Sequence, residues 1–92
     1  MVQFEWHPEK AHKNFIKHGI SFDEAATVFG DPLAVTIDDP DHSLEEPRLL
    51  TTGLSQRQRS MIVAHTERDG RIRIFSARDV TPAEREQYES GE

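Results

Sequence analysis

Arginines are concentrated between residues 57 and 78 of this 92-residue chain, and they form the grouping best suited to binding an anion. A guanidinium stays protonated at any relevant pH and presents paired N–H donors that fit the oxygens of a phosphate. The whole chain has a formal net charge of -6, but local potential decides where an anion is attracted, so an acidic protein can still carry a phosphate-binding face. The residues concerned are Arg57, Arg59, Arg68, Arg71, Arg73 and Arg78.

An Asp69-Gly70 pair divides this stretch and predicts a tight type I′ turn between antiparallel strands over 60–68 and 71–77. On the simple two-residue register, one face pairs Arg68 with Arg71, Thr66 with Arg73 and Ala64 with Phe75. The other face pairs Glu67 with Ile72, His65 with Ile74 and Val63 with Ser76, and it also receives Met61 and Arg78. The second face is apolar enough to pack on helices, and a one-residue bulge would exchange the faces.

Two interpretations of Arg68, Arg71 and Arg73 stay open. They form either a phosphate-binding platform or a solvated strand face that blocks aggregation and makes salt bridges with the acidic loop. The additional arginines of the same stretch favour the platform. Phe75 and Trp6 are aromatic groups on which a nucleobase could stack, although their positions are more typical of core residues.

Histidines are the second group with suitable chemistry, because an imidazole with a pKa near 6.5 exists in both protonation states near neutrality. His65 lies within an apolar strand, where a hydrogen-bonded core histidine is the default. His18 precedes Gly19 at a predicted helix end, where it favours the helix dipole. The acidic loop around Asp38, Asp39, Asp41 and His42 has no calcium-loop spacing, so we expect neither a metal nor a cofactor.

Local signals predict the elements that must position these groups. Pro8 and Gly19 bound a helix over 8–18, and a Ser21–Glu24 capping box begins another over 22–29. Alternating apolar residues predict a half-buried strand over 33–37, followed by one over 48–53. Thr81, Pro82 and Glu84 begin a last helix that runs to about 89. We therefore expect one α+β domain over 1–92, with two N-terminal helices, a four-stranded antiparallel sheet in meander order and a C-terminal helix.

The composition indicates an intracellular protein. The chain has no cysteine, which excludes disulfides and thiolate chemistry. It shows no signal-like start and no run of roughly 20 apolar residues. We expect a cytoplasmic protein without membrane contact.

Sequence blocks in a characteristic order cover nearly the whole chain. They are Phe4-Glu5-Trp6-x-Pro8-x-Lys10-Ala11, Asn14, Lys17-His18-Gly19-Ile20-x-Phe22-x-Glu24-Ala25, Val28-Phe29-x-Asp31-Pro32, Asp39-Pro40-Asp41-His42-Ser43, Gly53, Arg59, Val63-x-His65-Thr66-Glu67, Ile72-Arg73-Ile74-x-Ser76-Ala77-Arg78 and Glu84-Arg85-x-x-Tyr88-Glu89. Together they resemble the BrnT toxin family. His7 stands where that family usually has aspartate before the proline, and Asp79 makes the end of the chain less basic than in many relatives.

The resemblance implies a compact fold of the RelE/ParE superfamily and a ribosome-independent endoribonuclease. It also implies neutralisation by a BrnA-like antitoxin with a ribbon-helix-helix part. Operator DNA would then be bound only through the antitoxin, and a toxin dimer would sit in a heterotetramer.

Metal-free cleavage of RNA needs a base, an acid and donors that stabilise a charged pentacovalent phosphorus. We hypothesise that Arg73 and Arg78 are those donors, while Arg57, Arg59, Arg68 and Arg71 bind the flanking backbone. His65 or His18 would exchange the proton. Glu67 is an alternative base, and Lys17 or Tyr88 an alternative acid.

Two other function classes stay open. The chain would be a toxin that binds and inhibits a protein target, or a degenerate toxin that survives as a co-repressor with its antitoxin. The first predicts growth arrest without cleaved transcripts, and the second predicts neither arrest nor cleavage.

Overall fold

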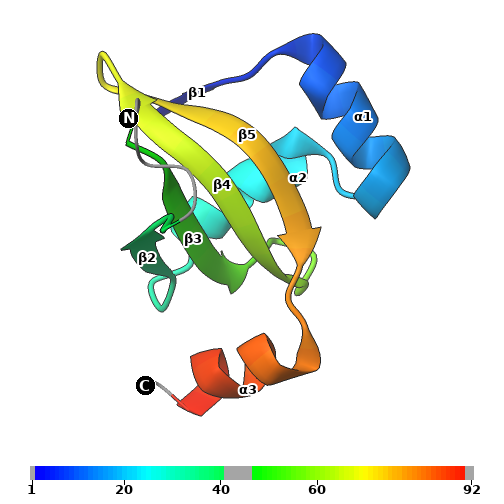
Figure 1. The fold of residues 1–92 in the computed structure, drawn as a ribbon, viewed down its shortest axis with the longest axis vertical. Helices are drawn as coiled ribbons and strands as arrows, with labels where there is room; N and C mark the ends of the chain where they lie inside the picture. Colours follow the sequence, from blue (N-terminus) through cyan, green and yellow to red (C-terminus); the bar gives the residue numbers. More distant parts are fainter. Residues whose placement is uncertain (1, 41–46, 91–92) are drawn as a thin grey trace.

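A computed structural model describes residues 2–40 and 47–90, with side chains described up to residue 87. Part of the acidic loop, including Asp41 and His42, lies outside the described residues. Within them the chain forms an α+β fold with three helices, a short 3-10 turn and a five-stranded mixed sheet (Figure 1). The prediction of an α+β fold is confirmed. The predicted four-stranded antiparallel sheet is wrong because the sheet has one further strand, which runs parallel to its neighbour.

That strand is β1 (Gln3–Glu5), which pairs in parallel with β5 (Arg71–Asp79). The remaining strands form the expected meander, β2 (Val35–Asp38), β3 (Leu49–Leu54), β4 (Ser60–Arg68) and β5, so the sheet order is β1-β5-β4-β3-β2. A three-residue strand carries too little alternation to be detected from periodicity, and its pairing joins residues almost 70 positions apart, as in Glu5 with Arg73. The prediction failed there because the pairing is non-local.

The helices begin and end where local capping directs them. In α1 (Pro8–His18) the backbone N–H of Glu9 donates to His7 Nδ1, and Gly19 ends the helix with a φ of 70°. In α2 (Phe22–Thr27) the N–H of Glu24 donates to the Ser21 hydroxyl. This helix stops two residues earlier than predicted, because the chain tightens into the 3-10 turn η1 (Val28–Gly30). The last helix, α3 (Pro82–Ser90), starts as predicted.

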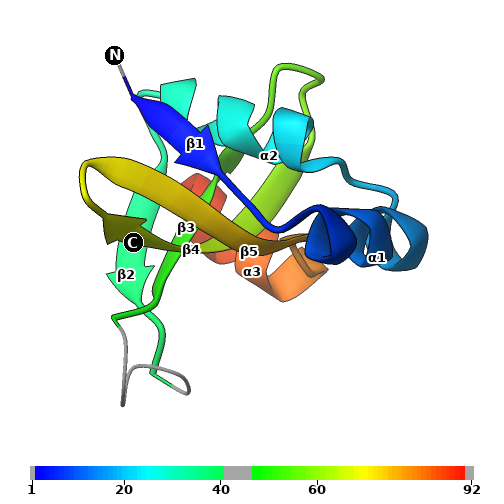
Figure 2. The same ribbon diagram turned by 90° about the horizontal axis from the view of Figure 1, so that it is seen from above.

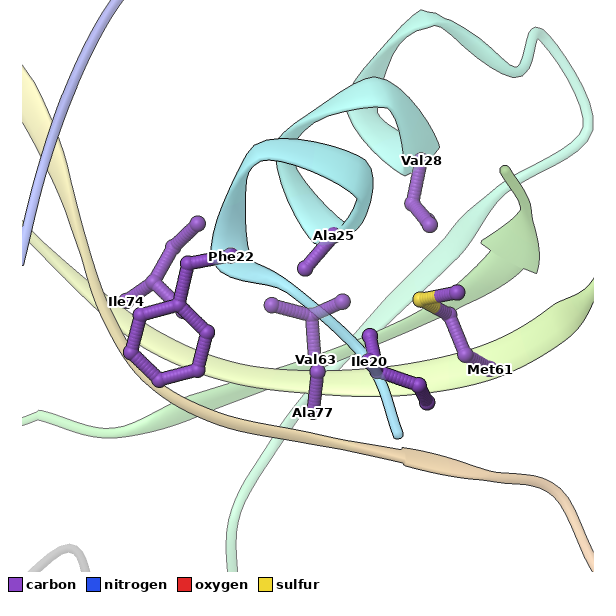
Figure 3. Packing of buried hydrophobic residues seen from close by; sticks show 8 residues of the cluster. All are labelled: Ile20, Phe22, Ala25, Val28, Met61, Val63, Ile74 and Ala77. Carbon is purple, nitrogen blue, oxygen red and sulfur yellow. The ribbon is translucent and has the colours of Figure 1, made fainter. Parts of the chain in front are cut away.

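The core lies between α2 and one face of the sheet (Figures 2 and 3). Phe22, Ala25 and Val28 face the sheet at helical spacing, and Ile20 before α2 and residues of β4 and β5 complete the cluster. Its members are Ile20, Phe22, Ala25, Val28, Met61, Val63, Ile74 and Ala77. The opposite face of the sheet carries Arg71, Arg73 and Arg78, and we call it the arginine face.

A β-bulge in β5 decides which residues reach the arginine face. The turn residues Asp69 and Gly70 have φ values of 54° and 76°, and the predicted pairs hold as far as His65 with Ile74. The register then shifts, so that Ala64 faces Ser76 and Phe75 has no partner on β4. The predicted pairs of Ala64 with Phe75 and of Val63 with Ser76 are therefore wrong.

This shift overturns the expected orientation of Arg78. Beyond the bulge Val63 faces Ala77, which is buried, and Ile62 faces Arg78. Side chains alternate along a strand, so Arg78 shares a face with Arg73 instead of pointing towards the helices.

Strand β2 is the exposed edge of the sheet. Val35 and Ile37 face Thr52 and Leu50, which alternate with residues directed at the core, so both point away from α2. They are 53% and 56% exposed, and Leu33 before the strand is 75% exposed. The predicted strand is present, over 35–38 instead of 33–37, but the expectation that it is half-buried is wrong because its apolar residues lie on the arginine face.

Helix α1 is fastened to the edge of β5 by one buried amide. Asn14 Nδ2 donates to the carbonyls of Ile20 and Ala77, and Asn14 Oδ1 accepts the N–H of Ala77, all at 3.0–3.1 Å. Strand β1 pairs with β5 only along residues 71–73, so the side chain of Asn14 takes the place of a neighbouring strand at Ala77.

Replacement of Asn14 by alanine leaves these backbone groups buried without partners. We expect Asn14→Ala to lower the free energy of unfolding by about 3 kcal/mol. Chemical denaturation measures this, with His12→Ala at an exposed position of the same helix as the control. Equal midpoints for the two variants would show that the amide does not hold α1.

Candidate functional site

The arginine face presents its guanidinium groups in ion pairs with acidic residues from other elements. Glu5 of β1 lies beside two of them, with Oε1 at 3.5 Å from Arg71 Nη1 and Oε2 at 3.2 Å from Arg73 Nη1. The side chains of Arg71 and Arg73 are 55% and 31% exposed. The register of β1 on β5 places Glu5 opposite Arg73, which accounts for this shared contact.

Arg78 is held by a carboxylate of α3. Its Nη1 and Nη2 donate to the two carboxylate oxygens of Glu84 at 2.9 and 3.0 Å. Glu84 also accepts the N–H of Thr81, and its own N–H donates to the Thr81 hydroxyl, which completes the capping box. The hydrogen bonds from Arg78, followed by that from Thr81, lower the pKa of Glu84 to about 2, so it is ionised at neutral pH.

These ion pairs are exposed enough to exchange. Arg78 and Glu84 are 44% and 36% exposed, and a solvent-exposed ion pair contributes only about 0–1 kcal/mol. An anion with two oxygens in the same plane can therefore compete with Glu84 for the same N–H groups.

Phe75, the extra residue of the bulge, lies among cations. Arg48 lies 4.4 Å and Lys10 lies 5.1 Å from the centroid of its ring. The ring is half-buried and does not belong to the core cluster. Phe75 is therefore not the core aromatic residue that we expected, whereas Trp6 does pack edge-on against Phe22.

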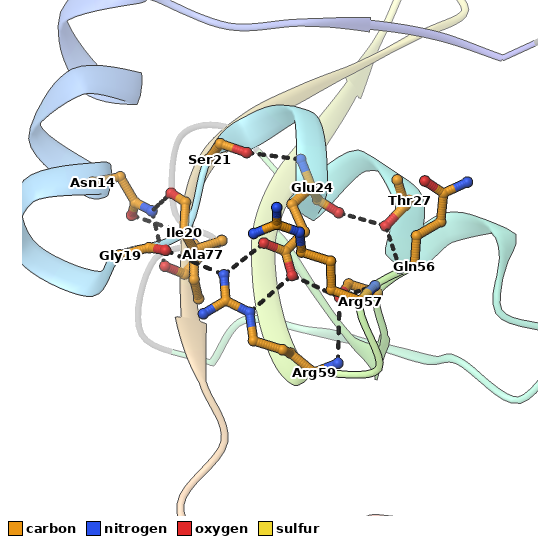
Figure 4. Close-up of polar contacts among 11 residues, drawn as sticks. Asn14, Gly19, Ile20, Ser21, Glu24, Thr27, Gln56, Arg57, Arg59 and Ala77 are labelled. Carbon is orange, nitrogen blue, oxygen red and sulfur yellow. Dashed lines mark hydrogen bonds and ion pairs between the residues drawn. The ribbon is translucent and has the colours of Figure 1, made fainter.

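Arg59 is engaged in a buried network that differs from the arginine face (Figure 4). Its Nε and Nη2 bind the two carboxylate oxygens of Glu24 at 2.9 and 2.5 Å, and Nη2 also donates to the Gly19 carbonyl. Glu24 is only 9% exposed and also accepts a hydrogen bond from Ser55. The hydrogen bond from Arg59 lowers the pKa of Glu24 despite its burial. Arg59 thus ties α2 to the turn between β3 and β4, while Arg57 in that turn is exposed.

His65 lies on the core side, as its predicted pairing with Ile74 requires. It is 3% exposed, its Nε2 shares a 2.7 Å hydrogen bond with Thr51, and Phe29 packs edge-on against the ring. Its Nδ1 is buried with no partner among the described residues. Burial lowers the pKa of His65 to about 4, so the imidazole is neutral at pH 7 and remote from the arginine face.

The other predicted proton-transfer residues lie at different ends of the fold. His18 is half-buried and follows Asn14 by one helical turn on the same side of α1, next to the end of β5 that carries Arg78. Lys17 is exposed at the same helix end. Glu67 faces Ile72 at the opposite end of the hairpin and on the core side. Tyr88 belongs to α3, and its side chain lies outside the described residues.

Sequence reasoning missed two acidic residues of the arginine face. Glu5 lies on a strand that was not predicted, although polar Gln3 and Glu5 alternate with apolar Phe4, which is a weak strand signal. Glu84 was assigned only to a helix cap. Its contact with Arg78 depends on the bulge.

The described residues contain no cluster of three or more His, Cys, Asp or Glu that could hold a metal ion. Nor do they include a helix that is long and apolar enough to cross a membrane. A hollow of about 700 Å³ lies on the core side between Phe4, Phe29 and the turn at Gln56, away from the arginine face.

Comparison with known proteins agrees with this architecture. A family model described as the ribonuclease toxin BrnT of type II toxin–antitoxin systems matches residues 6–84. No curated protein matches the chain. Among solved structures, the crystal structure of the Brucella abortus ribonuclease toxin BrnT is similar, with a TM-score of 0.64 and 17% identity over 88% of this chain and 99% of that one.

The buried imidazole makes stability depend on pH. In the unfolded chain His65 titrates at its ordinary value of 6.5, and in the folded protein at about 4, so the unfolded state binds the proton more readily between these values. We expect the free energy of unfolding to fall by about 2 kcal/mol through this residue when the pH drops from 7 to 5.

His65→Gln keeps a hydrogen-bonding group near Thr51 but does not titrate, so denaturation at the two pH values should show a loss smaller by that amount. His12→Gln, at an exposed position, serves as the control. An unchanged pH dependence in His65→Gln would mean that His65 is not held neutral by burial.

Proposed function

Because this chain belongs to the BrnT family of ribonuclease toxins of type II toxin–antitoxin systems, we propose that it cleaves RNA on its arginine face, with Arg73 and Arg78 as the phosphate ligands. One observation carries this proposal. Arg73 before the bulge and Arg78 after it lie on the same face of the sheet. Each forms an ion pair with a partly exposed carboxylate, which a phosphate can replace, and Arg78 also donates to the Asp79 carbonyl.

The two arginines would contact different phosphates of one strand. They are five residues apart on β5, which at about 3.3 Å per residue places their Cα atoms roughly 16 Å apart. Arg71 and Arg68 extend the same face towards the hairpin turn and would bind flanking backbone, as would Arg57 from its exposed turn. Arg59 already donates three hydrogen bonds to Glu24 and Gly19, so its contribution would be to shape the turn.

The proposed reaction is transesterification within the RNA. The 2′-hydroxyl oxygen attacks phosphorus and forms the P–O2′ bond as the P–O5′ bond breaks, which leaves a 2′,3′-cyclic phosphate and a 5′-hydroxyl. A base takes the 2′-hydroxyl proton, and an acid protonates the departing 5′ oxygen. We propose that this route is metal-independent, because a guanidinium can stabilise the charge on the pentacovalent phosphorus.

Geometry favours His18 over His65 for the proton transfer. His18 lies at the end of α1 that Asn14 fastens beside Arg78, whereas His65 is enclosed between Thr51 and Phe29 on the other face. Lys17 lies beside His18 in sequence and is the acid we favour; Tyr88 stays an alternative. Glu67 is far from Arg78 along the hairpin, which argues against its role as the base.

The regulatory part of the proposal follows from the type II family. We propose that RNA cleavage arrests growth by blocking translation in the cytoplasm, and that a BrnA-like ribbon-helix-helix antitoxin neutralises the toxin. A toxin dimer would join two antitoxin chains in a heterotetramer, and only the antitoxin would contact operator DNA.

Removal of either phosphate ligand should abolish most of the cleavage. We expect Arg73→Ala and Arg78→Ala to lower the cleavage rate about a hundredfold, the usual effect of losing one donor to a developing negative charge. The assay follows a labelled oligoribonucleotide in excess chelator and identifies the cyclic phosphate end. Lys13→Ala, which removes a 74% exposed cation from α1, is the matched control.

Full activity of both folded arginine variants would contradict the proposal. Growth arrest by the wild-type chain without cleaved transcripts would instead favour inhibition of a protein target, and the absence of both would favour a co-repressor.

The carboxylate of Glu84, which binds Arg78, should compete with RNA for that guanidinium group. Glu84→Gln keeps the capping box, in which glutamine serves as well as glutamate, but removes the charge opposite Arg78. We expect a two- to fivefold gain in affinity for a 2′-O-methyl oligoribonucleotide, which cannot be cleaved, since an exposed ion pair of up to about 1 kcal/mol is lost. Fluorescence anisotropy measures the affinity. Glu86→Gln changes the net charge equally on the same helix, so an equal gain there would refute the competition.

A further inference from the structure

We propose that Phe75 is a stacking platform for one nucleobase of the RNA strand, with Lys10 and Arg48 beside that base. This inference rests on the proposed ribonuclease function and extends it from the phosphates to a base. It assigns a ligand, an unpaired nucleobase, to a residue that neither the fold nor the phosphate contacts require.

Phe75 lies outside the core although the residue before it is fully buried. Its neighbour Ile74 is 1% exposed and belongs to the core, whereas Phe75 has no partner on β4 and remains half-buried outside that cluster. A phenylalanine at the extra position of a strand adds no pairing to the sheet and leaves part of its ring accessible.

The surroundings of the ring match those of a base-binding aromatic. Arg48 reaches it from the start of β3, and Lys10 from the first turns of α1, so cations from two separate elements converge on one ring. Cation–π contacts at accessible positions are weak, so a base can displace a cation from the π face. The displaced cation then lies next to the phosphates of the same nucleotide.

The position along β5 fits the same strand of RNA. Phe75 lies two residues after Arg73 and three before Arg78, between the two proposed phosphate ligands. Single-stranded RNA is commonly recognised by phosphate contacts combined with stacking of splayed bases on aromatic side chains. A strand that bridges Arg73 and Arg78 must pass Phe75.

Base stacking and electrostatic attraction to phosphates depend differently on salt concentration. The salt dependence of affinity therefore distinguishes stacking on Phe75 from the phosphate contacts. The probe is a 2′-O-methyl oligoribonucleotide that carries 2-aminopurine at successive positions, since this base is quenched when it stacks. We expect Phe75→Leu to lower affinity roughly tenfold and to relieve the quenching at one position. The slope of log affinity against log salt should stay unchanged, whereas Arg73→Ala should reduce it.

Phe15→Leu is the matched control, because Phe15 is an aromatic residue of α1 with 56% exposure and should change neither quantity. Phe75→Trp should retain the affinity and the quenching, and it tests the proposal even if the leucine variant folds poorly. Wild-type affinity and quenching in a folded Phe75→Leu, or loss of both in a folded Phe75→Trp, would overturn the stacking platform while Arg73→Ala still weakens binding. No binding of the probe by the wild-type chain would overturn the proposed function itself.

Discussion

A single amide, that of Asn14, holds the arrangement on which the candidate site depends. Strand β5 has a partner on its outer side only where β1 runs, and Asn14 supplies the missing donor and acceptor at Ala77. The same helix carries Lys10 at its start and His18 at its end. That contact helps to hold α1 beside the ring of Phe75 and the end of β5. One buried polar side chain thus links a core residue, Ala77, to the helix whose ends lie beside the arginine face.

Two bidentate arginine–glutamate pairs serve different purposes, and burial distinguishes them. Glu24 is 9% exposed and bound by Arg59 and Ser55, so loss of one partner would strand a buried charge, which costs several kcal/mol. Glu84 and Arg78 remain in contact with water, where their attraction is largely screened. The first pair is therefore fixed as part of the fold. The second leaves its guanidinium available to another anion.

Features coded by adjacent residues could be predicted from the sequence, and those that depend on distant partners could not. The caps at Ser21 and Thr81 and the Asp69-Gly70 turn set the helix starts and the hairpin, and the structure confirms them. Prediction failed for β1, whose partner is β5, and for the bulge, since a single extra residue does not alter apolar periodicity enough to be seen. The concentration of arginines between residues 57 and 78 identified the candidates, but only the structure separates Arg59, which binds Glu24, from Arg78.

The bulge at Phe75 also limits how this chain can change by insertion and deletion. Regular pairing with every residue retained would turn Ala77 out of the core and direct Arg78 towards α2, whereas loss of Phe75 itself would keep both residues on their present faces. A buried guanidinium without a partner would be far costlier than any exchange of side chains at these positions. Homologues should therefore either keep the extra residue together with the bulge or lack both, since only these two arrangements leave the last arginine of β5 on the arginine face.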